Sequence, residues 1–126
     1  MIDALNIIAA LLTIGFGAFG FLAPRFTASA LDLSPTNSTM GLSEMRASVG
    51  GLFVAMGIVA ILSGNPAFYV AIGIAFTGAA LGRVLSMLRD APPMGKVLLY
   101  FGIEAVLAIW LIGANISAIG GFQALV

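Results

Sequence analysis

The chain has 126 residues, no cysteine and no histidine, and its five cations are balanced by five anions. Hydrophobic residues make up 61% of it and charged residues only 8%, whereas a typical soluble domain carries about 25% charged residues. A soluble globule of this length keeps too much of its surface in water to hide so many apolar side chains. The composition therefore predicts a single transmembrane domain over residues 1–126, with lipid as its solvent.

The missing residue types exclude several kinds of site. Without Cys or His the chain has no disulfide, no zinc–thiolate site, no His-ligated haem and no His general base. Its six Met residues are scattered through apolar segments, which is typical of packing rather than of metal binding. A net charge of zero leaves no basic face for nucleic acid. We therefore expect no metal, no cofactor and no nucleic-acid partner, and we assign no catalytic residue.

Four segments are apolar for about the 20 residues that a helix needs to cross the hydrocarbon core. Their approximate bounds are residues 2–22, 44–62, 67–88 and 96–116. The connection between the first two segments is the longest, and a short helix at the membrane interface is expected there around residues 26–31. The predicted fold is all-α, an integral membrane four-helix bundle.

The other connections are short and rich in residues that disfavour helix. Ser63, Gly64, Asn65 and Pro66 predict a tight turn between the second and third spans. A Pro-Pro pair at 92–93 separates the third span from the fourth. Consecutive spans joined in this way are expected to lie antiparallel to one another.

The distribution of cations predicts how the bundle is oriented. Four spans place both termini on one side of the membrane and both longer connections on the other. Every cation falls at or near the side of the connections: Arg25, Arg46, Arg83, Arg89 and Lys96. The positive-inside rule then puts both longer connections in the cytoplasm and both termini outside.

Ionisable side chains inside membrane spans are costly, and they usually face a partner or a water-filled cavity. Glu104 lies roughly 12 Å into the fourth span, and Arg83 lies roughly 9 Å from the matching end of the third, at 1.5 Å per residue. Glu44 and Arg46 enter the second span from the same side. Tyr100 precedes Glu104 by one helical turn, so it shares that face.

These five residues have two interpretations. They form either a polar ligand-binding pocket open to the cytoplasm or a structural ion-pair network that holds the helices in register. Arg46 and Arg83 also have side chains long enough to reach lipid phosphates. Glu104 is shorter and deeper, so it is the most informative of the charges.

Glycines mark the helix faces that are expected to pack closely. Gly50 and Gly51 leave two adjacent positions of the second span without a side chain, and Gly78 and Gly82 form a G-x-x-x-G pair on the third. Small residues of this kind let helix backbones approach in lipid. Residues 15–20 fit G-x-G-x-x-G, but they follow no strand and lie inside a spanning helix, so the pattern does not indicate a nucleotide site.

The stretch EMRASVGGL at 44–52 and the stretch GRVLS at 82–86, followed by Glu104 in an apolar helix, give the chain a recognisable pattern. In this combination it resembles a bacterial family of small four-helix membrane proteins classified only as a domain of unknown function, which looks distantly similar to DoxX-type membrane proteins. The resemblance implies a four-helix bundle and the bacterial cytoplasmic (inner) membrane. It also groups six residues as a set: Glu44, Arg46, Gly50, Gly51, Arg83 and Glu104. It brings no established reaction.

Three functions stay open on the sequence. The leading hypothesis is a non-enzymatic binding or accessory module with membrane lipids, further copies of itself or a larger membrane complex as partners. The alternative is a small oligomeric transporter or proton-linked carrier that uses Arg83 and Glu104. The third is an enzyme acting on a lipid or quinone, with Glu104 as general acid–base beside Tyr100, which the missing residue types disfavour.

Overall fold

The computed structural model describes residues 2–121 and 123, and all regular structure among them is helical. Four helical stretches are long and apolar enough to cross a membrane, which confirms the predicted all-α fold and its four spans. They run over Asp3–Leu22, Met40–Ser63, Pro66–Arg89 and Met94–Asn115. The predicted single domain also includes residues 1, 122 and 124–126, which lie outside the described residues.

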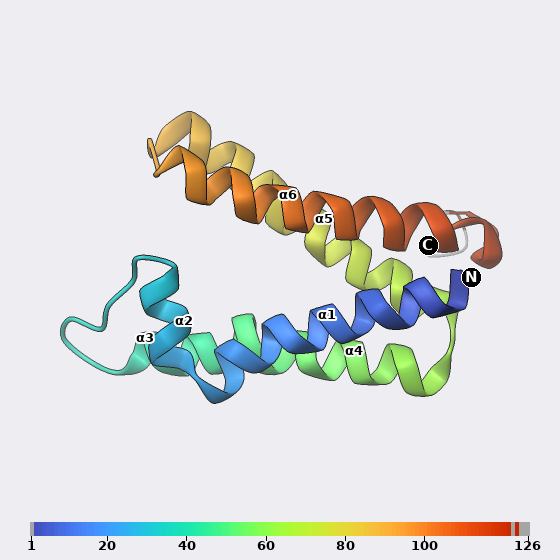
Figure 1. The fold of residues 1–126 in the computed structure, drawn as a ribbon, viewed down its shortest axis with the longest axis horizontal. Coiled ribbons are helices and arrows are strands. Elements are labelled where there is room, and N and C mark those ends of the chain that lie inside the picture. The colour runs from blue at the N-terminus through green and yellow to red at the C-terminus, as the bar shows by residue number, and fades with distance from the viewer. Residues whose placement is uncertain (1, 122, 124–126) are drawn as a thin grey trace. The chain divides into compact units, whose positions relative to one another are not determined.

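The chain folds as two compact units, here called unit 1 (Asp3–Gly64) and unit 2 (from Asn65), and each is described by itself. Unit 1 pairs the first span with the second, and unit 2 pairs the third with the fourth (Figure 1). The elements of unit 1 are α1 (Ile2–Leu22), α2 (Pro24–Ala30), α3 (Met40–Glu44), the π-helical η1 (Met45–Gly51) and α4 (Leu52–Ser63). Those of unit 2 are α5 (Pro66–Arg89), α6 (Met94–Asn115) and the 3₁₀ turn η2 (Ser117–Ile119).

The second span differs from the regular helix predicted over residues 44–62. It starts earlier, at Met40, and its segment Met45–Gly51 is π-helical. The mean hydropathy of a segment cannot distinguish a π-helix from an α-helix, because it depends on composition and not on the hydrogen-bonding pattern. π-Helical turns are rare and are frequent at functional sites, and this one carries Arg46.

Small residues hold α1 against the second span in unit 1. A Cβ built on Gly50 would lie 2.3 Å from the backbone nitrogen of Phe21, and one on Gly57 would lie 2.5 Å from Cγ1 of Ile14. A Cβ built on Gly17 would likewise lie 2.9 Å from the carbonyl oxygen of Gly50. The backbones touch because no side chain stands between them, which is the packing that lipid favours.

Unit 2 is an antiparallel pair of helices. The buried residues along their contact, here called the α5–α6 seam, recur every three or four positions. On α5 the buried residues include Tyr69, Ile72, Gly73, Phe76 and Ala80, and on α6 they include Val97, Leu107, Ala108, Leu111 and Asn115. Such a spacing keeps one face of each helix turned to the other. Gly73 fits against Leu111 and Ile112, since a Cβ there would lie 2.7 Å from Cγ1 of Ile112.

The predicted turn at residues 63–66 is present, and Gly64, Asn65 and Pro66 each have the role that their chemistry favours. Gly64 ends α4 in the left-handed region at φ +60°, and its N–H donates to the carbonyl of Ala60 at 3.0 Å. The side chain of Asn65 accepts from the N–H of Ala67 at 2.9 Å and caps α5, whose first residue is Pro66. The short helix expected around residues 26–31 is α2, which begins at Pro24. Its location at the membrane interface stays a prediction.

Large apolar side chains lie mostly on the outside of this protein. Leu12, Phe16, Leu22, Leu88 and Ile109 are between 46% and 79% exposed. The buried positions of α1, in contrast, are small or polar, including Asn6, Ala10 and Thr13. An arrangement with small residues inside and large apolar residues outside suits lipid and not water.

Candidate functional site

Arg83 and Glu104 continue the packed seam of unit 2 toward the α5–α6 connection. Arg83 follows Ala80 by three residues, in step with the buried face of α5, and Glu104 precedes Leu107 by three residues on α6. The two helices are antiparallel neighbours, so the same register that places Gly73 beside Ile112 brings Arg83 beside Glu104. The sequence placed both charges at similar depth, and the seam explains why they face each other.

The ion pair uses two nitrogens of the guanidinium. Nη2 of Arg83 donates to Oε1 of Glu104 at 3.0 Å, and Nε lies 3.3 Å from both Oε1 and Oε2. This is the forked geometry in which arginine recognises a carboxylate. The Glu104 side chain is 13% exposed and that of Arg83 is 33% exposed. The Glu104 side chain is therefore mostly enclosed, whereas a third of the Arg83 side chain is open.

Tyr100 completes the cluster. The guanidinium carbon of Arg83 lies 5.2 Å from the centroid of the Tyr100 ring, which is within reach of a cation–π interaction. Tyr100 and Glu104 stand one turn apart on α6, so both hold the same guanidinium. Arg83, Tyr100 and Glu104 are called the α5–α6 charge cluster below.

The other two predicted charges belong to unit 1 and have partners there. The hydroxyl of Ser48 donates to the carboxylate of Glu44, one turn away. Nη1 of Arg46 donates to the carbonyl oxygen of Phe21 at 2.5 Å. That carbonyl lies in the last turn of α1, where four backbone acceptors lack helical partners. The predicted grouping of all four charges in one cluster stays a prediction.

The predicted packing glycines fall into two groups. Gly50 touches the backbone of α1, and a Cβ on Gly51 would lie 3.2 Å from the carbonyl of Arg46. Gly78 and Gly82 have no such neighbour, because a Cβ on either would meet no described atom within 4 Å. Close packing of α5 on α6 therefore depends on Gly73, which follows the seam spacing, and does not require the G-x-x-x-G pair.

The α5–α6 charge cluster is suited to binding and to positioning. The described residues contain no group of three His, Cys, Asp or Glu side chains that could hold a metal ion. The carboxylate of Glu104 is already bonded to Arg83, so the side chain of the cluster more open to a partner is that of Arg83. A guanidinium donates up to five hydrogen bonds and accepts none, which favours an acceptor such as a carbonyl, carboxylate or phosphate.

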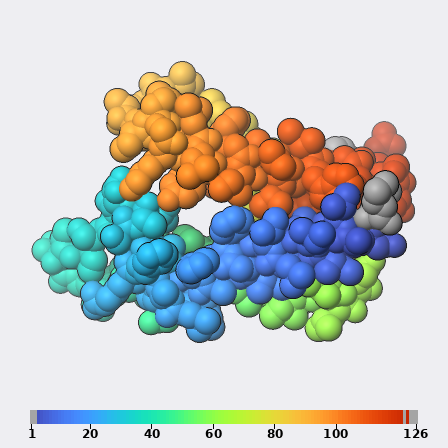
Figure 2. All heavy atoms as spheres, in the orientation of Figure 1, coloured from blue at the N-terminus to red at the C-terminus, as the bar shows by residue number. Residues whose placement is uncertain are grey.

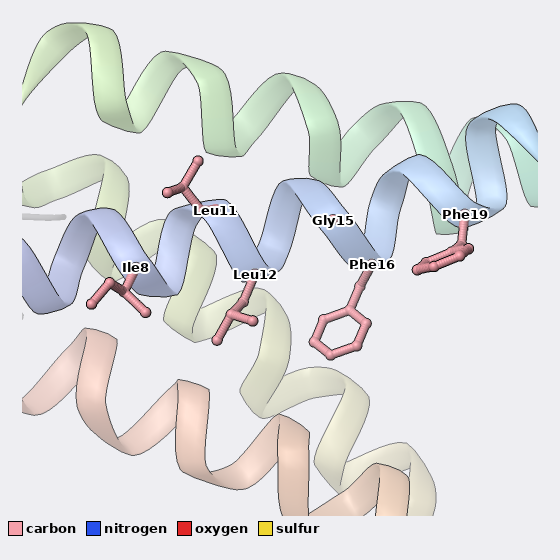
Figure 3. Close-up of a pocket in the computed structure, with 6 residues that line it drawn as sticks. All are labelled: Ile8, Leu11, Leu12, Gly15, Phe16 and Phe19. Carbon is pink, nitrogen blue, oxygen red and sulfur yellow. The ribbon is translucent and has the colours of Figure 1, made fainter.

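Two hollows in the surface are lined by apolar residues. One, of about 320 Å³, lies along α1, where Ile8, Leu12 and Phe16 project from the same side of the helix (Figure 3). The other, of about 530 Å³, lies along α6 and includes Trp110. With so few polar groups these hollows suit acyl chains better than a polar substrate.

A third hollow has a different character, because Arg25, Arg46, Thr39 and Ser43 contribute to its lining. It lies in the segment between α1 and α4, which gathers at one end of unit 1 (Figure 2). The sequence did not predict this hollow. Arg25 entered the sequence argument only as one of the cations that orient the bundle in the membrane.

Comparison with known proteins identifies one family. Its model, described as a domain of unknown function (DUF4345), matches residues 2–114. No curated protein matches the chain, and no solved structure does. The match confirms the predicted resemblance to a family of unknown function, and it leaves the similarity to DoxX-type proteins a prediction.

Proposed function

Because the chain belongs to the DUF4345 family, a domain of unknown function, we propose its activity from its own chemistry: it is a non-enzymatic, multi-pass membrane protein that acts as a binding or accessory module. The four apolar spans support the membrane setting. The observation that carries the proposal is the α5–α6 charge cluster, in which Glu104 is mostly enclosed and a third of the Arg83 side chain is exposed.

The exposed part of Arg83 is the feature that favours a partner. A cation within a membrane span is stabilised only when polar groups surround it. Glu104 and Tyr100 cover part of the guanidinium, and a third of the side chain stays exposed. An acceptor from a neighbouring transmembrane helix, in a further copy of this chain or in a larger membrane complex, would complete the shell around it.

The charge distribution further supports an orientation in a bacterial cytoplasmic membrane with both termini outside. In unit 1 the cations Arg25 and Arg46 lie at the end that carries the longer connection. In unit 2 Arg83, Arg89 and Lys96 lie toward the α5–α6 connection. The positive-inside rule places these ends in the cytoplasm.

Purification in mild detergent tests the accessory role, and the chain offers a matched control. Arg89 lies on the same helix as Arg83, at its exposed end. We expect a defined membrane partner, or a second copy, to co-purify in fixed stoichiometry with the wild type and with Arg89→Gln, and to be lost with Arg83→Gln.

Isolation of the wild type as a lone monomer under the same conditions would contradict the accessory role. Measuring flux into liposomes distinguishes the alternative function, a carrier, from the accessory role. A solute or proton flux that is present in the wild type and abolished by Glu104→Gln would support a carrier in place of an accessory module.

A further inference from the structure

We propose that the polar hollow of unit 1 binds the phosphate group of an anionic membrane lipid. The hollow lies where α1, α2 and the start of the second span meet, and its volume is about 630 Å³. It belongs entirely to unit 1, so this inference does not rest on the function proposed for the α5–α6 charge cluster.

The charge of the hollow selects an anion. Arg25 and Arg46 both line it, together with the hydroxyl-bearing side chains of Thr39 and Ser43. Within the described residues, neither arginine forms an ion pair with a carboxylate. The nearby carboxylate of Glu44 is bonded instead to the hydroxyl of Ser48. Two guanidinium groups and two hydroxyls are the donors that phosphate oxygens require.

Arg46 is held in place before any ligand arrives. Its Nη1 donates to the carbonyl of Phe21 in the last turn of α1. This contact uses one of the five N–H groups of the guanidinium and leaves the others for a ligand. The side chain therefore loses less conformational freedom when it binds an anion than a free surface arginine would.

The position of the hollow points to a lipid rather than a free anion. It lies where the first span ends, at Leu22, and where the second begins, at Met40, which is the depth of lipid headgroups. Leu22 and Phe26 belong to the same lining and are 71% and 64% exposed. They offer an apolar surface to the acyl chains of a lipid whose phosphate meets the arginines. Basic pockets at the ends of spans bind anionic headgroups in this way.

Native mass spectrometry of the detergent-purified protein tests the proposal. The probes are phosphatidylglycerol and phosphatidylcholine of the same acyl chains, added in equal amounts, and the readout is the fraction of protein that retains each lipid. We expect the wild type to retain phosphatidylglycerol preferentially. Arg25→Gln should reduce that retention about tenfold, as expected for the loss of a charge-assisted contact.

The choice of variants keeps a folding defect apart from a binding defect. Arg25 is exposed, and no hydrogen bond of its side chain is present within the described structure, so Arg25→Gln should keep the wild-type melting temperature. Arg46→Gln also removes the bond to Phe21, so it serves only as a second variant. Arg89→Gln, in unit 2, is the control for the loss of a cation.

Three outcomes would overturn the proposal. The first is equal retention of the two lipids by the wild type. The second is a loss of phosphatidylglycerol as large in Arg89→Gln as in Arg25→Gln. The third is displacement of phosphatidylglycerol by excess inorganic phosphate, which would assign the hollow to a free anion instead of a lipid.

Discussion

Arg83 on α5 and Glu104 on α6 meet side-on, with Nη2 3.0 Å from Oε1 and Nε 3.3 Å from both carboxylate oxygens. The pair ties the two helices together at the end of a seam that is otherwise apolar or small. In water an exposed ion pair contributes about 0.2–1 kcal/mol. Breaking a buried pair costs roughly 3–5 kcal/mol, because an uncompensated charge is left behind. The half-buried Arg83 places this pair between those limits.

Removing one partner of this pair should lower the free energy of unfolding more than removing both partners. We expect Glu104→Gln to lower the free energy of unfolding by roughly 1–3 kcal/mol, and the double variant with Arg83→Gln to recover part of that loss. Thermal unfolding in detergent measures it, with Asp90→Asn as the control carboxylate at the end of α5. A double variant as unstable as the sum of the two single variants would show that the two side chains do not interact.

The ring of Tyr100 should matter more than its hydroxyl. Tyr100→Phe keeps the aromatic face beneath Arg83, whereas Tyr100→Leu removes it, and a cation–π contact of this kind is worth about 0.5–2 kcal/mol. We therefore expect the melting temperature to fall further for Leu than for Phe. In an Arg83→Gln background that difference should shrink, because no cation is left over the ring. An unchanged difference would rule out the contact.

Glycines with the same sequence pattern should differ sharply in their tolerance of a methyl group. Gly50→Ala places a Cβ 2.3 Å from the backbone of Phe21, so we expect a loss of about 1–3 kcal/mol or more from overpacking. Gly73→Ala should also destabilise, through Ile112.

Gly78→Ala and Gly82→Ala are the matched controls. A Cβ at either meets no described atom within 4 Å, and alanine is about 1 kcal/mol better than glycine within a helix. Both variants should melt at or above the wild-type temperature. If they instead change the oligomeric state in detergent, the G-x-x-x-G face packs on a second copy.

Single-cysteine labelling tests the proposed orientation without background, since the chain contains no cysteine. In intact cells a membrane-impermeant thiol reagent should label Asn65→Cys from outside, and Ser34→Cys only after the membrane is opened. The reverse pattern would invert the topology and place the α5–α6 charge cluster toward the outer side.

Hydropathy, turn chemistry and spacing were enough to predict the four spans, the turn at residues 63–66 and the short helix after α1. These features are local, because each depends on the solvent that a segment prefers or on the backbone angles of a few residues. The shared depth of Arg83 and Glu104 also followed from counting residues along two helices joined by a short connection.

Contacts between helices decided the rest. The bond from Arg46 to Phe21 and the close approach of Gly50 to α1 depend on how two backbones meet. The π-helical conformation of the segment that carries Arg46 was not predicted from the sequence either. Gly50 and Gly82 look alike in the sequence, yet only Gly50 has a backbone against it within the described residues. Arg83 and Glu104 were placed at one depth by the sequence, but their forked contact came from the register of the α5–α6 seam, which is set by side-chain packing along both helices.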